Sequence, residues 1–429
     1  MSAFGTKREV RRELSSRSAV FALCLGNAVE WYDFALYGAF ATVIGPLFFP
    51  AEDHSTVMLA AFATYGTALI VRPIGALLFG RMADARGRRA VMVPVILIMA
   101  GATAAVGFLP SYAVIGVLAP VILILLRATQ GLAAGGELGV AGAFIFERAE
   151  SRHRGELASW HTSTLALGLG SGMALAALLF LVERSSPTET GWWRLAFVLA
   201  LPLGLVGMFV RRRVSETSQF LAVWQAGQMI KRPIPALWAN HRLAVIRGFA
   251  LIAAGSLAFN TFFIFMPNHL AATMRLDIAS TLSISALMLL VAAAAAVALG
   301  RLSDVVGRRP VAMLSTVALA ALAAPMSVVA STSRLGLLLA QMLIGAAMAG
   351  VLLVAMVGEL FPTRLRSTGM SMTAGLASAL IGGTAPAIDQ ILVTALGRDI
   401  APGVYVSLVA CLALVALWRW PETAFKPTT

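Results

Sequence analysis

Long apolar runs alternate with short polar segments over almost the whole chain. Twelve of these runs are long enough to cross a bilayer as helices, since one span takes about 20 residues. A polar stretch separates the first six runs from the last six. The runs cover residues 19–45, 59–80, 90–109, 118–146, 157–182, 193–210, 243–267, 279–300, 311–330, 335–358, 367–396 and 402–420. The pattern therefore predicts an all-α membrane protein with twelve transmembrane helices.

Composition agrees with this prediction and excludes other classes of protein. Apolar residues make up 59% of the 429 residues and charged residues only 12%, whereas soluble domains have about 45–50% and about 25%. A soluble globular protein, a disordered chain and a nucleic-acid-binding domain are excluded on this ground. Cys24 and Cys411 both lie inside apolar runs, so we interpret them as small core residues rather than a disulfide or a metal pair.

The distribution of positive charge predicts the topology. With the N-terminus in the cytoplasm, 25 of the 33 Lys and Arg residues fall on the cytoplasmic side, five outside and three within spans. Positive charge in cytoplasmic loops sets the orientation of membrane proteins. We therefore expect a multi-pass protein of the plasma (inner) membrane with both termini cytoplasmic. The net charge of +13 then reflects orientation and contact with anionic lipid, not binding of nucleic acid.

A glycine–aspartate–glycine–arginine motif occurs once in each group of spans. The first copy follows the second span, and the second copy follows the eighth span 220 residues later (300 − 80). Orientation requires only the arginines, so the spacing of the glycines and the aspartate indicates a further role. The two copies comprise Gly80, Asp84, Gly87 and Arg88, and Gly300, Asp304, Gly307 and Arg308.

Two further pairs of residues repeat between the groups. Glu147 ends the fourth span and Glu359 ends the tenth, 212 residues later (359 − 147). Glu216 follows the sixth span and Glu422 follows the twelfth, 206 residues later (422 − 216). One matched pair after each even-numbered span predicts two six-helix repeats in parallel orientation. We assign an N-terminal bundle, a cytoplasmic linker and a C-terminal bundle to residues 1–211, 212–240 and 241–429.

Ionisable side chains inside spans are the first functional candidates, because each costs several kcal/mol unless it is paired or hydrated. Glu30 and Asp33 are three residues apart and lie on one face of the first span. Two carboxylates so close cannot easily both ionise in a low dielectric, so at least one is a candidate proton carrier, with Asp33 slightly favoured. The alternative is that one of them hydrogen-bonds the helix backbone or pairs with an arginine.

The fourth span carries Arg127, Gln130 and Glu137 on one stripe that faces the interior of the bundle. The donor fork of Arg127 suits a substrate carboxylate or a protein carboxylate. The alternative is a permanent structural pair between Arg127 and Glu30 or Asp33. Glu137 nears the cytoplasmic end of its span, where we expect contact with water.

Three further residues complete the candidate substrate and coupling set. Arg72, in the second span before Pro73, fits a structural or coupling role better than substrate selection. Asn260 is the polar candidate of the seventh span, and Asp389 lies toward the outer end of the eleventh. Asp389 bears on substrate identity, although a solvated position at the rim is the simpler expectation. The chain has no phosphate-binding glycine loop and no metal-ligand spacing, so we expect no cofactor and no metal.

Together these motifs resemble the major facilitator superfamily, and more narrowly its metabolite:proton symporter family. The resemblance covers nearly the whole chain. It implies the two-repeat fold, proton-coupled transport and a small cargo such as a zwitterionic osmolyte, citrate, 2-oxoglutarate or shikimate. It rests on Asn27-x-x-Glu30-Trp31-Tyr32-Asp33-Phe34, Arg72-Pro73-x-Gly75 and Arg127-x-x-Gln130-Gly131-x-x-x-Gly135-Gly136-Glu137.

The resemblance also implies a role for the repeated motifs. In such transporters Asp84 and Arg88 clamp the cytoplasmic ends of the two halves together while the cavity is open outward. Glu147 and Glu359 are the candidate partners of these clamps. We therefore assign both motif copies and both glutamates to a cytoplasmic gate.

The sequence thus predicts a secondary transporter that imports a small carboxylate or zwitterion with protons by alternating access. The alternative is an exporter of drugs or metabolites that works by proton antiport, since the Arg127-x-x-Gln130-Gly131 element is similar to that branch as well. A transporter-like sensor is less consistent with intact gating motifs in both halves. An enzyme is least expected, because no nucleophile and base can be paired.

Overall fold

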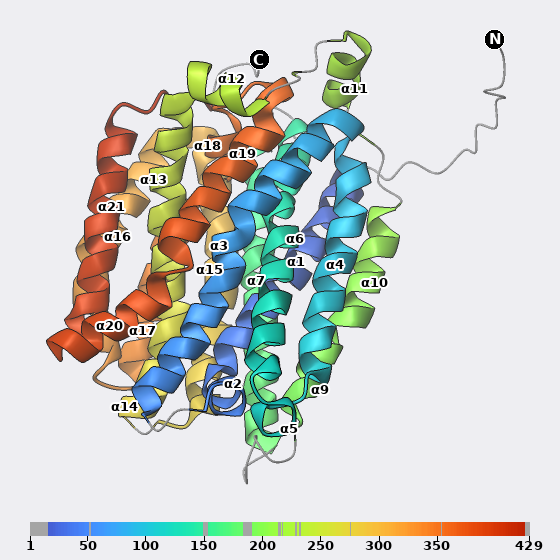
Figure 1. The fold of residues 1–429 in the computed structure, drawn as a ribbon. Coiled ribbons are helices and arrows are strands. Elements are labelled where there is room, and N and C mark those ends of the chain that lie inside the picture. Colours follow the sequence, from blue (N-terminus) through green and yellow to red (C-terminus); the bar gives the residue numbers. More distant parts are fainter. Residues whose placement is uncertain are drawn as a thin grey trace.

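The computed structural model is a bundle of long helices that run roughly side by side (Figure 1). Eleven helices are long and apolar enough to cross a membrane, judged on the described residues. The first span, α1 (Ser16–Ala39), lies among them and completes the predicted twelve. The structure describes residues 16–50, 53–148, 153–182, 191–212, 216, 218–227, 230, 233–274, 276–352 and 354–424.

The remaining helices follow the two groups of six. The other spans of the N-terminal half are α3 (His54–Arg86), α4 (Arg88–Phe108), α6 (Leu118–Arg148), α7 (Arg154–Val182) and the pair α9 (Trp193–Val198) and α10 (Ala200–Arg211). Spans of the C-terminal half are α13 (Arg242–Phe259) with η2 (Asn260–Phe265) and α14 (Met266–Thr273), α15 (Ile278–Val306), α16 (Arg308–Ala330), α17 (Arg334–Val351) with α18 (Val354–Gly358), α19 (Thr363–Ala377) with η3 (Ser378–Gly382) and α20 (Ala385–Leu396), and α21 (Ile400–Trp418). Short helices between spans are α2 (Ala41–Phe48), α5 (Tyr112–Ile115), α11 (Ser218–Gln225) and α12 (Pro233–Asn240).

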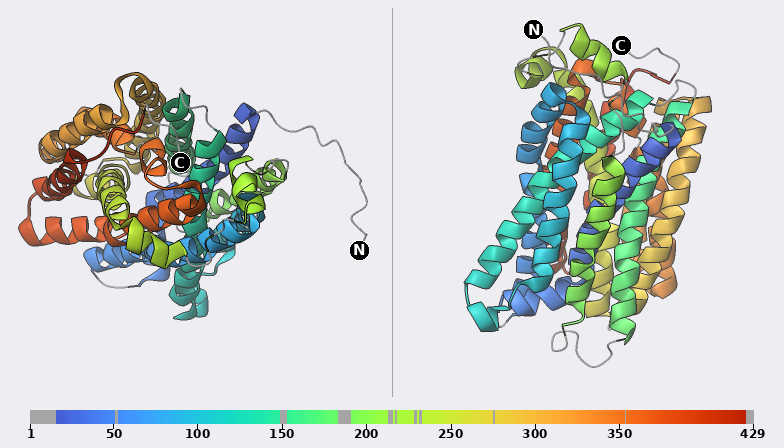
Figure 2. Two further views of the ribbon diagram at one scale, coloured as in Figure 1. Left: turned by 90° about the horizontal axis from the view of Figure 1, so that it is seen from above. Right: turned by 90° about the vertical axis from the view of Figure 1, so that its right-hand side faces the viewer.

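The two halves meet along four long helices. The fifth span, α7, packs along the eighth, α15, and the second, α3, packs along the eleventh, α19. Each contact therefore joins a second span of one repeat to a fifth span of the other, as expected for two related six-helix units. Figure 2 shows the helices grouped around a common centre when the bundle is seen end-on.

Glycine ends both helices that carry the repeated motif. Gly87 ends α3 with φ 95°, and Gly307 ends α15 with φ 110°. A side chain is strained at such angles, whereas glycine adopts them freely. The next helix begins at the following residue in each case. The two motif copies therefore form equivalent tight turns at one end of the bundle, which we call the motif end.

Two spans that the apolar pattern predicts as continuous helices contain a wider π-helical turn. In the seventh span η2 precedes Pro267, and in the eleventh span η3 precedes Pro386. Proline has no N–H and leaves a carbonyl of the preceding turn without its usual donor. Such turns within α-helices often mark functional sites.

Candidate substrate and proton site

The N-terminal half buries three arginine–carboxylate pairs inside its spans. None of the six side chains belongs to a residue more than 4% exposed. Removing two charges from water is expensive unless their contact and other hydrogen bonds repay the cost. Three such pairs in one bundle are therefore candidates for function rather than for stability. They are Arg127 with Asp33, Arg72 with Glu30, and Arg211 with Glu137.

Asp33 on α1 is held by two side chains of α6. Arg127 donates from Nη1 to Oδ2 at 2.9 Å, and Gln130 donates from Nε2 to Oδ1 at 2.9 Å. The amide oxygen of Gln130 accepts a hydrogen bond from Arg127 at 2.7 Å, which closes the triangle. The arginine fork lies over the rings of Tyr37 and Phe34, 4.4 and 5.0 Å from their centroids. Nε and Nη2 of Arg127 have no hydrogen-bond partner, so the side chain retains donors for a second anion.

Glu30, one turn earlier on α1, pairs with Arg72 on α3. Nη2 of Arg72 donates to Oε1 of Glu30 at 2.8 Å. The guanidinium of Arg72 also lies 4.6 Å from the ring centroid of Phe34 and 5.0 Å from that of Trp31, where a ring face attracts a cation. The two carboxylates of α1 therefore have separate arginine partners, and the pairing with arginine that the sequence left as an alternative is present for both.

Glu137 differs from its expected environment. The sequence places it near the end of its span in contact with water, but the residue is only 3% exposed. Both of its carboxylate oxygens accept hydrogen bonds from Arg211 at the end of α10. Arg211 also donates to the carbonyl oxygen of Met92 at 3.0 Å. The expectation that Glu137 is in contact with bulk water at the end of its span is wrong, because the residue is buried and its carboxylate pairs with Arg211.

Arg211 is the residue of this site that sequence reasoning missed. It follows an apolar run and precedes Arg212 and Arg213, so the sequence groups it with the cytoplasmic arginines that set topology. Its guanidinium packs against Gly26 of α1, where a Cβ would lie only 1.8 Å from Nη2. Two signals were available in the sequence. One is the glycine in α1, and the other is that the candidate site residues of the N-terminal spans include three carboxylates but only two arginines, Arg72 and Arg127.

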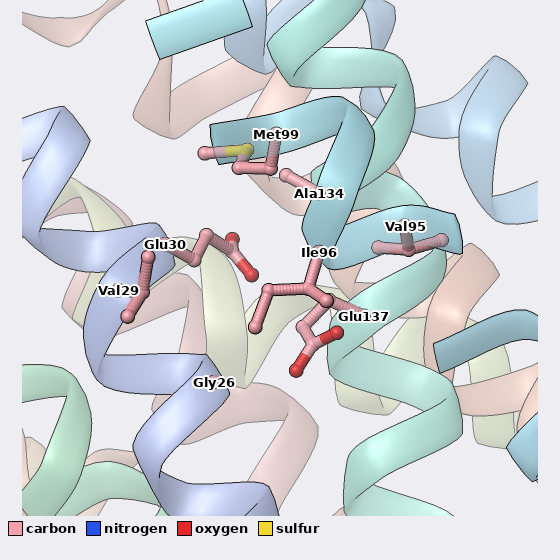
Figure 3. Close-up of a pocket in the computed structure, with 8 residues that line it drawn as sticks. All are labelled: Gly26, Val29, Glu30, Val95, Ile96, Met99, Ala134 and Glu137. Atoms are coloured by element: carbon pink, nitrogen blue, oxygen red, sulfur yellow. The ribbon is translucent and has the colours of Figure 1, made fainter. Parts of the chain in front are cut away.

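A narrow cavity lies between the pairs of Glu30 and Glu137. Figure 3 shows both carboxylates directed toward it from α1 and α6. It offers about 10 Å³ to the centres of water molecules, which is about the room that one buried water needs. Its lining is formed by Gly26, Val29, Glu30, Val95, Ile96, Met99, Ala134 and Glu137.

The C-terminal half buries one carboxylate in this region, Asp389 on α20. It is 0% exposed, so the expected solvated position at the rim is wrong. Thr261 in η2 donates to its Oδ2 at 2.7 Å, while Oδ1 has no hydrogen-bond partner. Within the described part of the chain no Lys, Arg or His pairs with it. Asp389 is thus a buried acceptor without a cation.

Polar contacts join the halves next to this residue. Tyr65 of α3 donates to Oδ1 of Asn260 in η2 at 2.8 Å. Nearer the end opposite the motifs, Asn268 donates to the carbonyl oxygen of Gly38 at 3.0 Å. The rings of Phe62 and Phe265 lie 6.1 Å apart there. These contacts close the bundle at that end.

At the motif end, Glu147 joins the halves on one side. Nη2 of Arg88 lies 2.9 Å from Oε1 of Glu147 within the N-terminal half. Nη1 of Arg366 approaches the same oxygen from α19 at 3.5 Å. Arg88 also donates to the carbonyl oxygen of Thr363 at 3.5 Å. One glutamate of the first repeat therefore holds arginines from both halves. Asp84 was assigned to this gate as well, but its side chain lies outside the described residues.

The second motif copy makes the equivalent connection. Glu359 lies 3.6 Å from Nη1 of Arg154 in the other half and 3.5 Å from Nε of Arg308 in its own. Asp304 accepts hydrogen bonds from the backbone N–H groups of Gly155 and Glu156, at 2.8 and 2.9 Å. Gly155 and Glu156 belong to the first turn of α7, so the carboxylate of Asp304 also faces the positive end of that helix dipole.

The two motif glycines pack differently. A Cβ on Gly300 would lie 2.5 Å from the Cβ of Ser159 in α7, whereas one on Gly80 would meet nothing nearer than 3.6 Å, at Thr368 of α19. The backbone of α15 therefore approaches α7 more closely than α3 approaches α19. The two halves are therefore packed more closely at the second copy of the motif than at the first.

This arrangement can hold a proton, orient an anion and close at either end. Among the described residues no group of three or more His, Cys, Asp or Glu side chains is placed to bind a metal ion. Of the buried Arg, Asp and Glu residues that the structure describes away from the motif end, only Asp389 comes from the last six spans.

Comparison with known proteins agrees with this architecture. The family model "Sugar (and other) transporter" matches residues 19–229, and the model "Major Facilitator Superfamily" matches residues 249–429. A proline/betaine transporter of Salmonella typhimurium is 31% identical over 424 residues, which cover 96% of this chain and 84% of the relative. The alpha-ketoglutarate permease of Escherichia coli is 32% identical over 424 residues, covering 96% and 94%.

A solved structure has the same fold. The proton:xylose symporter XylE bound to 6-bromo-6-deoxy-D-glucose superposes with a TM-score of 0.76 over 95% of this chain and 96% of that one. Its sequence identity is 17%, so the likeness concerns the fold alone.

Proposed function

The chain belongs to the major facilitator superfamily of membrane transporters, and from that premise we propose that it imports a small organic acid or zwitterionic metabolite together with protons. The observation that carries the proposal is the buried cluster of carboxylates and arginines on α1, α3 and α6. Ionisable groups within spans mark ion and proton pathways. We assign coupling to Glu30, Asp33 and Arg127, supported by Arg72, Gln130 and Glu137.

The substrate class follows from the groups left without partners. Arg127 has two unused donor nitrogens, which suit a substrate carboxylate. Asp389 has an unused acceptor and no cation, which suits a substrate ammonium group. A zwitterion satisfies both sites, whereas a dicarboxylate leaves Asp389 uncompensated. We therefore favour a zwitterion within the proposed class. Relatives named for proline and betaine, and for alpha-ketoglutarate, span both types.

Transport proceeds by alternating access, in which the two six-helix halves rock about a site near the membrane midplane. The proposed halves are residues 1–211 and 241–429, joined by the linker 212–240. Glu147, Glu359 and Asp304 bridge the halves at the motif end, and these bridges must break for that end to open. We assign the gate to them.

The positively charged loops support a proposal for the orientation of the protein in the membrane. The motif end carries Arg88, Arg89, Arg308 and Arg309 next to the linker, so the positive-inside rule makes it cytoplasmic. The start of α1 and the end of α21 lie at this end (Figure 1). We propose a plasma-membrane location with both termini in the cytoplasm.

The function is tested with purified protein in liposomes that contain a pH-sensitive dye, with no imposed gradient. Organic acids, betaines, amino acids and cationic drugs are added outside one at a time, beside an Asp33→Asn variant. Internal acidification by an acid or zwitterion that the variant loses supports proton symport. Internal alkalinisation by a cationic drug instead establishes antiport export, the alternative reading of the sequence.

A further inference from the structure

We propose that the cavity between Glu30 and Glu137 holds a water molecule, and that the oxygen of Glu30 facing this cavity carries the transported proton. The inference rests on the proposed symport function and assigns its proton to one atom and one route. Glu137 and Arg211 then form the cytoplasmic end of that route.

The cavity has the size and chemistry of a water site. Its room of about 10 Å³ for water centres is close to the volume that one water occupies by this measure. A buried water also requires about two to four polar partners. Carboxylates from two different helices face the cavity here (Figure 3). A water in this position links Glu30 to Glu137 by hydrogen bonds.

The free oxygen distinguishes Glu30 from Asp33. Both oxygens of Asp33 already accept N–H donors, from Arg127 and Gln130. Protonating either oxygen places a proton against an existing donor. Glu30 accepts one hydrogen bond, on Oε1 from Arg72. Its Oε2 is available to take a proton without breaking that contact, so Glu30 is the better carrier and Asp33 the better fixed anion.

The proton step balances without any other reactant. The Glu30 carboxylate takes one proton and becomes a neutral acid that still accepts from Arg72. On release, this proton passes to the cavity water while the water gives a proton to Glu137. Both oxygens of Glu137 accept hydrogen bonds from Arg211, so one of these bonds must break when the proton arrives, and Glu137 passes the proton on rather than storing it. Protonated Glu137 also loses its charge attraction to Arg211, which lies next to the exposed Arg212 at the cytoplasmic end of α10. The proton then leaves on that side.

The helix directions support the order of these groups. The chain enters the membrane along α1 and meets Gly26, Glu30 and then Asp33, so Glu30 lies about one turn nearer the cytoplasm than Asp33. On α6 the chain returns, and Glu137 lies about 15 Å nearer the cytoplasm than Arg127. The charged side chains that act on Glu30 are Arg72, Glu137, Arg211 and Asp33.

The test compares coupled uptake with exchange in liposomes for wild type and Glu30→Gln. Exchange of labelled for unlabelled substrate needs no net proton movement. We expect Glu30→Gln to lose pH-driven uptake by about a hundredfold and to keep exchange within about twofold. Asp277→Asn, which retains a capping side chain at the start of α15, is the matched control and keeps both activities.

The cavity itself is tested by Ala134→Val, which fills it, beside Ala104→Val, which adds the same volume to a buried site away from it. We expect only Ala134→Val to slow proton-coupled uptake while exchange continues. Should either variant fail to fold, infrared spectroscopy of wild type replaces it: the band of a protonated carboxylic acid must appear at the pH of transport and shift in Glu30→Asp.

Two kinds of failure are distinguishable. Wild type that exchanges substrate but never acidifies the lumen contradicts the symport function itself. Wild type that acidifies the lumen, with Glu30→Gln doing so equally, leaves symport intact and overturns the assignment of the proton to Glu30. Absence of the acid band, or a band unchanged in Glu30→Asp, overturns it as well.

Discussion

The two halves of the molecule repeat the same helices but bury different side chains. Offsets of 220, 212 and 206 residues relate the even-numbered spans (300 − 80, 359 − 147 and 422 − 216). Applied to the four buried charged residues of the second, fourth and sixth spans that lie away from the repeated motifs, they give apolar residues. Arg72 corresponds to Ala292, Arg127 to Leu339, Glu137 to Ala349 and Arg211 to Leu417. At the motif end, in contrast, the charges of the two halves match.

The difference in buried charge suggests that the two halves serve different steps of the proposed transport. The gate needs symmetry, because each half must clasp the other at the motif end, and Glu147 and Glu359 do so in equivalent ways. The proposed proton site needs no such symmetry, and its arginine–carboxylate pairs lie, among the described residues, in the N-terminal half. The C-terminal half contributes Asp389, Thr261 and Asn260, groups suited to recognising a substrate. In the proposed function we therefore assign coupling and substrate selection to different halves.

The largest expected effect comes from disturbing the charged half. Arg127→Lys keeps the positive charge but loses the planar fork that joins Asp33 and Gln130. We expect proton-coupled uptake to fall by about a hundredfold, as small misplacements in such sites do. Uptake of labelled substrate into liposomes under an inward proton gradient measures it.

The corresponding position in the other half provides the control. Leu339→Met alters the residue related to Arg127 by the repeat, at a partly exposed apolar site. Uptake within about twofold of wild type is expected there. Equal losses at both positions contradict the division between the halves.

Asp389→Asn tests the proposed role of the C-terminal half in substrate selection. Replacing the carboxylate removes the proposed partner of a substrate ammonium group, and hydrogen bonds to charged groups contribute about 1.5–3 kcal/mol. We expect KM for a zwitterion to rise about tenfold or more, with little change for a dicarboxylate. Asp399→Asn, at a more exposed carboxylate of the same half, leaves KM unchanged. An equal rise for both substrate types contradicts the assignment.

Gly80 and Gly300, the first glycines of the two motif copies, allow the two sides of the proposed gate to be compared. Gly300→Ala forces a Cβ against Ser159, whereas Gly80→Ala has room beside Thr368. Overpacking costs about 1–3 kcal/mol, so we expect Gly300→Ala to favour the cytoplasm-open state about tenfold. The population of the cytoplasm-open state is measured by the rate at which Ser367→Cys is alkylated from the cytoplasmic side. Cys24 and Cys411 are first removed. Faster alkylation in Gly80→Ala than in Gly300→Ala is the contrary result.

Glu422 carries the smallest expected effect. Burial opposes its ionisation, but backbone N–H groups of Ala424, Arg308, Arg309 and Thr423 donate to it and lower its pKa below the ordinary value. A lowered pKa contributes stability that is present above the unfolded-state pKa and is lost as pH falls through the folded-state value. We expect Glu422→Gln to lower Tm by about 1–2 °C at pH 7, with the difference from wild type vanishing in acid. A constant difference at all pH values contradicts this account.

The sequence predicts the span pattern, the buried carboxylates of α1 and the partners at the motif end, because apolar length, charge and repetition are local properties. It does not predict which arginine meets which carboxylate, since that depends on helix rotation. Arg211 cannot be distinguished in the sequence from Arg212 and Arg213, which follow it and are explained by the positive-inside rule. The sequence predicts Asp389 at the rim because it lies toward the outer end of its span, whereas the packing of α20 against η2 buries it beside Thr261.

The most direct test of the account is the number of protons that accompany each substrate molecule, measured by paired dye and tracer fluxes in liposomes. It is determined for wild type, Glu30→Gln and Asp389→Asn. We predict that Asp389→Asn needs more substrate but keeps the wild-type ratio, while Glu30→Gln loses proton movement. A ratio that falls in Asp389→Asn and persists in Glu30→Gln would contradict the assignment of coupling to the N-terminal half.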